Sequence, residues 1–301
     1  MNKVMKRVIT ACLAFAMILA LITPASVEAA STKKITLYVG EAYSMRCSDF
    51  YKVTSISNSK GSYAKVTPHK SDRKFDITAK SAGNTVVTVK GKNYRNKALT
   101  EKLSVTVVKQ NFSITAQKID AGNVLFTLKN NTKTTFDRIS AVYTLKDSTG
   151  AVASSQEVKF YNVISGKVNY SSVYVGRDAD IDCSQAEFKI TGLSRDLNYN
   201  YKTAGDKEVT VEKINETEDD RYIKFKLRET SKLNNYVYGH VYIISYDASG
   251  NITNVDSRSL SLGKKEVRTT SEYTLYKSST LYPNFDHYEI VTQAYSMTRK
   301  K

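Results

Sequence analysis

Residues 138–152 read RISAVYTLKDSTGAV, and residues 238–252 read YGHVYIISYDASGNI. In the first stretch apolar side chains occupy every second position from Ile139 to Leu145, which is the pattern of a strand with one buried face. Each stretch then reaches an Asp-x-x-Gly turn, beginning at Asp147 and at Asp247, as expected for a β-hairpin. The two stretches therefore predict an all-β chain in which tight turns join the strands.

The two stretches lie 100 residues apart, and two further pairs of segments keep nearly the same spacing. These pairs are residues 125–128 with 223–227 and residues 188–190 with 288–290. A repeat of this length is large enough for each copy to hold its own core, so it indicates tandem domains. We therefore expect one β-sandwich repeat over 109–203 and a second over 204–301, with a polar connection near 194–206.

Further short alternating runs lie upstream of the repeats. Residues 35–41 read ITLYVGE, residues 75–89 read FDITAKSAGNTVVTV, and residues 103–107 read LSVTV. Together these segments resemble the group 2 bacterial immunoglobulin-like domain. The resemblance covers residues 31–108 and implies a small sandwich that serves as a spacer or binding module and has no shared catalytic residues. We therefore expect an immunoglobulin-like domain over 30–108, and tandem immunoglobulin-like β-sandwich modules throughout.

The first thirty residues have the pattern of an export signal. A basic start at Lys3, Lys6 and Arg7 precedes an apolar run over 8–22, and small residues then lead to Ala29. We expect cleavage after Ala29, which makes residues 1–29 a signal peptide and the mature protein secreted, extracellular or associated with the cell envelope. An uncleaved anchor is the alternative, but the run is shorter than the roughly 20 residues that span a bilayer. We expect no transmembrane anchor after cleavage.

The chain is strongly basic, with a formal net charge of +16. Such a balance favours anionic partners, so we expect an anionic cell-wall polymer, a glycan or a surface protein as the partner. No recognised nucleic-acid-binding motif occurs, and no specific nucleic acid is expected. The lysines are spread along the chain, so a solvated basic surface is the alternative, and the oligomeric state stays open.

The sequence contains none of the common catalytic motifs, and we expect a protein that is not an enzyme. The strongest candidate for a metal site is the alternating triplet Asp178, Asp180 and Asp182. In an extended segment these three carboxylates would point the same way and repel one another unless a cation such as calcium neutralised them. A solvated loop is the alternative reading, so we expect no cofactor, with calcium at this triplet as the exception.

Two cysteines, Cys47 and Cys183, remain after signal cleavage. Two cysteines cannot form a disulfide framework, and neither has a neighbour at the spacing of metal ligands. Packed free thiols are therefore expected, and a disulfide between modules is the alternative in an oxidising compartment.

A comparison of the repeats strand by strand identifies a candidate ligand site. Outward positions that are mostly polar in the first repeat hold Tyr238, His240, Tyr242 and Tyr246 in the second. Exposed tyrosine offers a large, rigid contact area with a polar tip. We therefore predict that these side chains contact a protein or glycan ligand. The alternative is that another strand, or the first repeat, covers them.

The function expected from these features is that of a secreted, non-enzymatic cell-surface or adhesion-type binding protein. One alternative is a structural envelope or matrix component that assembles with itself through sheet edges. Another is a non-catalytic accessory module of a secreted enzyme system.

Overall fold

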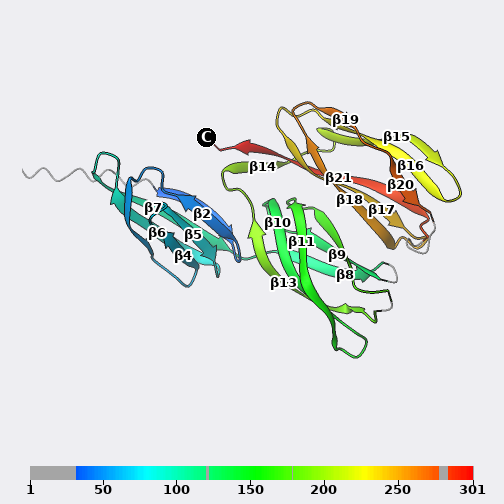
Figure 1. The fold of residues 1–301 in the computed structure, drawn as a ribbon, viewed down its shortest axis with the longest axis horizontal. Coiled ribbons are helices and arrows are strands. Elements are labelled where there is room, and N and C mark those ends of the chain that lie inside the picture. The colour runs from blue at the N-terminus through cyan, green and yellow to red at the C-terminus, as the bar shows by residue number, and fades with distance from the viewer. Residues whose placement is uncertain (1–31, 120–121, 178, 278–283, 301) are drawn as a thin grey trace, which may run out of the picture. The chain divides into compact units, whose positions relative to one another are not determined.

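The computed structural model describes residues 32–119, 122–177, 179–277 and 284–300 (Figure 1). Its regular elements are the β-strands β1 to β21, which pair into several sheets. The all-β sandwich architecture predicted from the alternating sequence is confirmed. In this part of the chain no helix is long and apolar enough to cross a membrane. The expected signal peptide, residues 1–29, lies outside the described residues.

The chain forms two compact units. Among the described residues, unit 1 consists of those in 32–37 and 43–108, and unit 2 consists of those in 38–42 and 109–300. The long second unit contains both copies of the sequence repeat.

Unit 1 is a sandwich of two sheets. The first sheet has the order β1 (Thr32–Tyr38), β7 (Ala98–Val108), β6 (Gly83–Lys92) and β3 (Lys52–Asn58). The second sheet has the order β2 (Ala42–Arg46), β5 (Lys74–Ala79) and β4 (Ala64–His69). The predicted alternation is confirmed, because Phe75, Ile77 and Ala79 are all buried. Each faces the core from β5, while the residues between them face away.

Unit 2 begins with the sandwich of the first repeat. One sheet has the order β12 (Val168–Tyr174), β9 (Asn123–Asn130) and β8 (Phe112–Lys118). The other has the order β11 (Val152–Val163), β10 (Phe136–Lys146) and β13 (Asp182–Ser194). In immunoglobulin-like sandwiches strands A, B and E share one sheet and strands C and F share the other, and this order follows that pattern.

The second repeat builds a sandwich with the same order. One sheet contains β15 (Val209–Glu218), β16 (Tyr222–Ser231) and β19 (Val267–Thr269), and β20 (Tyr273–Tyr276) also pairs with β16. The other has the order β14 (Tyr199–Thr203), β21 (His287–Arg299), β17 (Val237–Tyr246) and β18 (Ile252–Leu262). Strand β14, which the sequence places in the first repeat, therefore completes a sheet of the second.

The strand registers repeat as closely as the sequence does. Leu145 pairs with Ser154 in β10–β11, and Ser245 pairs with Asn254 in β17–β18, with a bulge directly after each pair. The turns match as well, because Asp147 and Asp247 each accept backbone hydrogen bonds from the residues two and four positions later. The hairpins predicted at these two aspartates are confirmed, and positions 100 residues apart can be compared directly.

Candidate functional site

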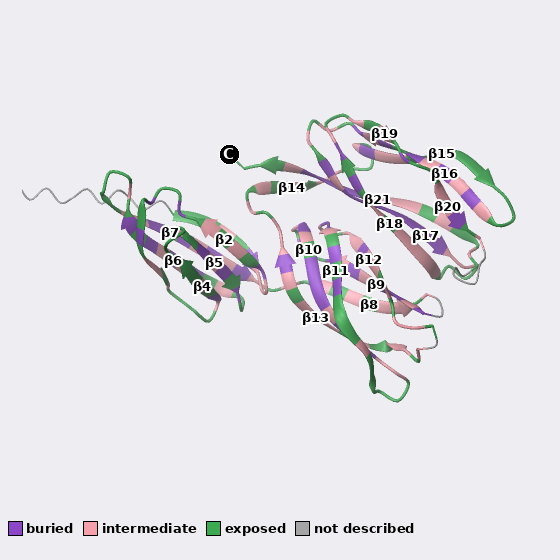
Figure 2. Cartoon of the chain, in the orientation of Figure 1, coloured by how far each residue is buried: buried purple, intermediate pink, exposed green. Residues whose placement is uncertain are grey.

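The predicted aromatic site lies on β17, and this strand is buried on both of its faces (Figure 2). On the face predicted to be exposed, Tyr242 has no exposed surface and His240 is 8% exposed. Tyr238 and Tyr246 are half-buried. The expectation of an open tyrosine surface is therefore wrong at the centre of the strand, while ligand contact by Tyr238 and Tyr246 stays a prediction.

Strands β11 and β12 of the first repeat cover this face of β17. The Tyr242 hydroxyl accepts a hydrogen bond of 2.9 Å from Asn169 Nδ2, and the edge of the Tyr170 ring meets the Tyr242 ring at 5.1 Å between centroids. Two residues of β21 join the same contact: the Tyr295 hydroxyl lies 3.0 Å from Asn162 Oδ1, and the Gln293 amide donates to a β12 carbonyl. The aromatic side chains that distinguish the second repeat therefore serve to pack the two sandwiches of unit 2 together.

His240 is a titratable side chain that lies within this contact between the two sandwiches. Its Nε2 lies 2.8 Å from the carbonyl oxygen of Tyr161, and its Nδ1 lies 3.3 Å from the Ser257 hydroxyl. Burial lowers the pKa of His240, and the backbone hydrogen bonds only partly oppose this effect. The folded state therefore favours the neutral form of the His240 imidazole over the protonated form.

We expect unit 2 to lose stability as the pH falls below the ordinary histidine value of 6.5. A lowered pKa in the folded state means that the unfolded chain takes up the proton first, so protonation favours unfolding in this window. The loss is up to about 1.4 kcal/mol for each pH unit between the two pKa values. Guanidinium unfolding at pH 7 and pH 5 measures this loss, and His240→Asn is expected to reduce it. His69→Asn in unit 1 is the matched control, and equal losses in wild type and His240→Asn would contradict the role of His240.

Two of the three carboxylates proposed for calcium have other partners. Asp180 accepts hydrogen bonds from the backbone and hydroxyl of Ser148. Asp182 accepts hydrogen bonds from the backbone and hydroxyl of Ser184 and from the Gln185 amide. Asp178 lies outside the described residues, and within them no cluster of three potential metal ligands is found. Calcium binding at this segment therefore stays a prediction.

Cys47 and Cys183 are free thiols. Burial raises the pKa of the Cys47 thiol to about 11, and burial also raises the pKa of Cys183. Both thiols are therefore protonated at neutral pH, which makes them poor nucleophiles.

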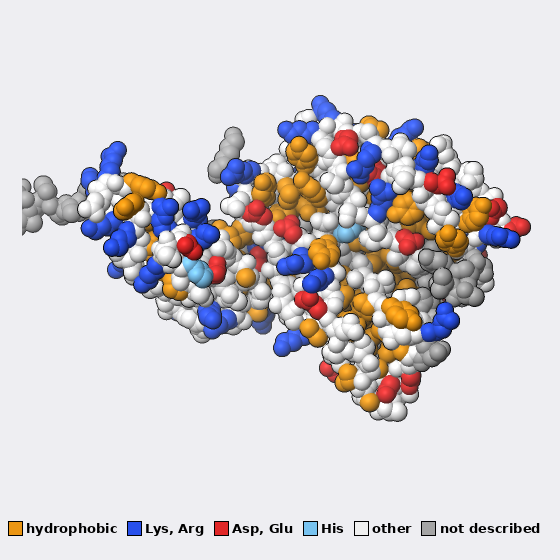
Figure 3. Space-filling model, viewed as in Figure 1, with side chains coloured by type: hydrophobic (Ala, Val, Ile, Leu, Met, Phe, Trp, Pro, Cys, Tyr) orange, Lys and Arg blue, Asp and Glu red, His pale blue; other side chains and the backbone are white. Residues whose placement is uncertain are grey.

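The basic charge of the chain is concentrated in unit 1. Residues 32–37 and 43–108 contain 15 Lys and Arg but only 4 Asp and Glu, whereas residues 38–42 and 109–300 contain 26 and 24. In the space-filling view, basic side chains clearly outnumber acidic ones over unit 1 (Figure 3). The sequence-based prediction, which found lysines along the whole chain, missed this difference because it counted charge over the whole chain and not over the domain predicted at 30–108.

Five of these lysines share the outer face of one sheet, and we call this surface the lysine face. Its members are exposed and occupy outward positions of the four strands: Lys34 on β1, Lys52 on β3, Lys90 and Lys92 on β6, and Lys102 on β7. The β3–β6 register places Lys52 directly opposite Lys92, an arrangement of like charges that destabilises a sheet. The outward positions of these four strands, all within residues 32–108, contain no Asp or Glu.

Hydroxyl side chains fill the spaces between the lysines. Ser55 pairs with Lys90 across β3 and β6, and Lys90 pairs with Thr100 across β6 and β7. Neighbouring strands lie about 4.8 Å apart, and alternate residues on one strand lie about 6.8 Å apart. The lysine face is therefore a regular array of ammonium groups and hydroxyl groups, and it can neutralise and hydrogen-bond several anionic groups of one extended chain.

No protein-family model matches this chain, and no curated protein is significantly similar to it. The candidate functional surface of this protein therefore rests on its own geometry, and that surface is the lysine face of unit 1.

Proposed function

We propose that this protein is a secreted, non-enzymatic surface protein that binds an anionic envelope polymer through the lysine face of unit 1. The observation that supports the proposal is the pairing of Lys52 with Lys92 in a face that has no acidic residue. Such repulsion costs stability when the protein is alone and is relieved when an anion neutralises the lysines. The basic start and apolar run of residues 1–29 support secretion.

The chemistry of the lysine face favours a phosphate-bearing wall polymer over a nucleic acid. Lysine binds phosphate as a compact point charge, and the neighbouring hydroxyl groups can donate to the phosphate oxygens. Proteins that bind single strands of nucleic acid add aromatic side chains on which bases stack. Apart from Tyr38, whose ring packs against Phe136, the outward positions of β1, β3, β6 and β7 are lysine, small, amide-bearing, hydroxyl-bearing or aliphatic residues.

We also propose that unit 1 is a group 2 bacterial immunoglobulin-like domain. The segments that carry the resemblance form β1, β5, β6 and β7, which contribute to both sheets of its sandwich. Such a domain would supply a rigid sheet on which the lysine spacing is fixed.

The variant K52Q/K90Q/K92Q/K102Q is expected to bind poly(glycerol phosphate) at least ten-fold more weakly than the wild type. Each lysine that pairs with a phosphate releases a counterion. The slope of the logarithm of the affinity against the logarithm of the salt concentration should therefore become shallower by about 1 for each lysine removed. Titration of the mature chain across a salt series, followed by isothermal calorimetry, measures both quantities. The side chains are exposed, so the variant is expected to keep its stability.

The control variant K133Q/K207Q/K232Q/K264Q removes the same charge from exposed positions of unit 2. If both variants lose affinity equally, the net charge of the protein binds the polymer and the lysine face has no special role. If the wild type does not bind the polymer at all, the proposed function is wrong.

A second candidate function is self-assembly through β13, and one feature favours it. In the described chain β13 ends the sheet β11-β10-β13, with one further bridge from Leu193 to Glu41. Antiparallel pairing of two copies of β13 about Phe188 would place Glu187 of one copy opposite Lys189 of the other, which is a favourable cross-strand pair. Sedimentation of the wild type without polymer tests this function, because concentration-dependent assembly would support it.

A further inference from the structure

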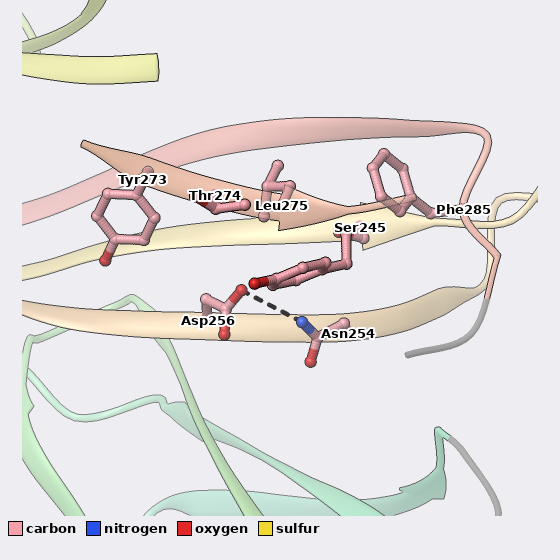
Figure 4. Close-up of a pocket in the computed structure, with 8 residues that line it drawn as sticks. Ser245, Asn254, Asp256, Tyr273, Thr274, Leu275 and Phe285 are labelled. Carbon is pink, nitrogen blue, oxygen red and sulfur yellow. Dashed lines mark hydrogen bonds between the residues drawn. The ribbon is translucent and has the colours of Figure 1, made fainter. Parts of the chain in front are cut away.

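The second sandwich of unit 2 contains a cavity of about 140 Å³ between β17–β18 and β20 (Figure 4). This volume is about ten times the smallest space that admits one water molecule. Ser245, Asn254, Asp256, Tyr273, Thr274, Leu275, Tyr276 and Phe285 line it. The lining therefore combines aromatic side chains with hydroxyl, amide and carboxylate groups.

The first repeat fills the corresponding space. At the position of Ser245 it has Leu145, which is fully buried and pairs with Ser154 as Ser245 pairs with Asn254. At the position of Ile243 it has Tyr143, which is also fully buried. The second repeat has the smaller residues Ser245 and Ile243 at these two positions. The region that Leu145 and Tyr143 fill in the first sandwich is therefore open in the second.

The same comparison shows that polar groups have gathered at the emptied region. Asp256 and Asn254 stand where the first repeat has Gln156 and Ser154. Asn254 Nδ2 donates to Asp256 Oδ2 at 3.3 Å, and in Figure 4 the Tyr273 hydroxyl points toward the strand that carries Asp256. A cavity produced by chance loss of packing would be lined by the apolar side chains of the old core, as engineered cavities are.

Asp256 is a half-buried carboxyl without an ion pair among the described residues. Burial raises the pKa of Asp256, and the hydrogen bond from Asn254 only partly opposes the rise. A ligand that brings hydrogen-bond donors would stabilise the carboxylate form in this setting.

We propose that this cavity binds an uncharged saccharide ring, with Ser245, Asn254 and Asp256 on its hydroxyl groups and the rings of Tyr273, Tyr276 and Phe285 along its apolar face. A saccharide hydroxyl both donates and accepts hydrogen bonds, so it satisfies the carboxylate, the amide and the serine hydroxyl together. An organic ammonium ion, which is the other ligand that suits an acid among aromatic rings, has no acceptor and would satisfy neither the Ser245 hydroxyl donor nor the second amide N–H of Asn254. The proposal concerns unit 2 and does not depend on the lysine face of unit 1.

Saturation-transfer NMR on the mature chain tests this site with a panel of neutral sugars at millimolar concentration: glucose, galactose, mannose, N-acetylglucosamine and maltose. We expect transfer to at least one sugar. The variant Ser245→Leu restores the side chain of the first repeat and is expected to abolish the transfer while the melting temperature stays equal or rises, since filling a cavity commonly stabilises a protein. Asp256→Asn is expected to weaken binding of the same sugar at least ten-fold.

Asp206→Asn, at an exposed position of unit 2, is the matched control and is expected to keep full binding. The proposal is overturned if none of the five sugars shows transfer, or if transfer persists in Ser245→Leu. It is also overturned if tetramethylammonium binds to the wild type, the sugars do not, and Ser245→Leu abolishes the tetramethylammonium binding. The cavity would then be a site for organic ammonium ions. Loss of polymer binding in the lysine variants leaves these results unchanged, so the two proposals fail separately.

Discussion

Replacement of Tyr242 by serine is expected to lower the free energy of unfolding of unit 2 by about 3–5 kcal/mol, the usual cost of removing a buried aromatic ring. Tyr242 has no exposed surface, so the variant leaves a cavity between the two sandwiches. It also removes the hydroxyl that accepts the hydrogen bond from Asn169, a residue that is itself 1% exposed. The Asn169 amide still donates to the Tyr161 carbonyl, but its other N–H loses its acceptor, which adds to the loss.

Hydrogen exchange followed by mass spectrometry measures this effect, because it reports the peptides of each unit separately. Peptides from β12 and β17 should lose protection in the variant, while peptides of unit 1 should not. Tyr236→Ser is the control, because Tyr236 is 57% exposed and lies next to the same strand. Equal protection in Tyr242→Ser and Tyr236→Ser would show that the contact between the sandwiches contributes no stability.

The architecture could be predicted from the sequence because its signals are local. Alternation at residues 139–145 sets which side chains face the core, and Asp147 with Gly150 sets the turn, so both features follow from short stretches of chain. The repeat could be predicted for the same reason, since it is a comparison of two such stretches. These features do not depend on what lies next to the sandwich.

The environment of the aromatic stripe could not be predicted in the same way. Alternation correctly placed His240 and Tyr242 on the face opposite Val241 and Ile243, but it could not show that β12 of the other repeat covers this face. One available signal was β17 itself, whose apolar and aromatic residues run almost without interruption from Val237 to Ile244. Such runs are typical of strands that are buried on both faces.

The lysine face and the cavity were missed because both arise from pairs of positions on different strands. Lys52 and Lys92 are far apart in the sequence and become neighbours only when the β3–β6 register is known. Ser245 and Asp256 look like ordinary polar residues until the register shows that fully packed residues occupy the matching positions of the first repeat. A comparison of the repeats on their inward positions as well as their outward ones would have found the second signal.

A buried charge in the second repeat carries the other large expected effect. Glu229 continues the inward-facing series of Phe225 and Leu227 on β16 and has no exposed surface. Arg268 Nε lies 3.0 Å from Glu229 Oε2, and Arg258 Nε lies 3.6 Å from Glu229 Oε1. The first repeat ends the corresponding series of β9 with a neutral residue, Asn130, which donates hydrogen bonds to backbone carbonyls. The second repeat therefore places an acid and two arginines where the first repeat uses an amide.

The variant R258M/R268M is expected to lower the free energy of unfolding of unit 2 by about 3–5 kcal/mol, because it leaves the Glu229 carboxylate buried without a cation. The triple variant E229M/R258M/R268M should recover most of this loss, since replacing a whole buried ion cluster by apolar side chains is often neutral or stabilising. Guanidinium unfolding of the wild type and both variants at pH 7 provides the comparison. If the triple variant is as unstable as the double variant, the arginines stabilise unit 2 by packing their side-chain stems, and the charge of Glu229 has no part in it. If the double variant is as stable as the wild type, water reaches Glu229 in solution and the acid needs no partner.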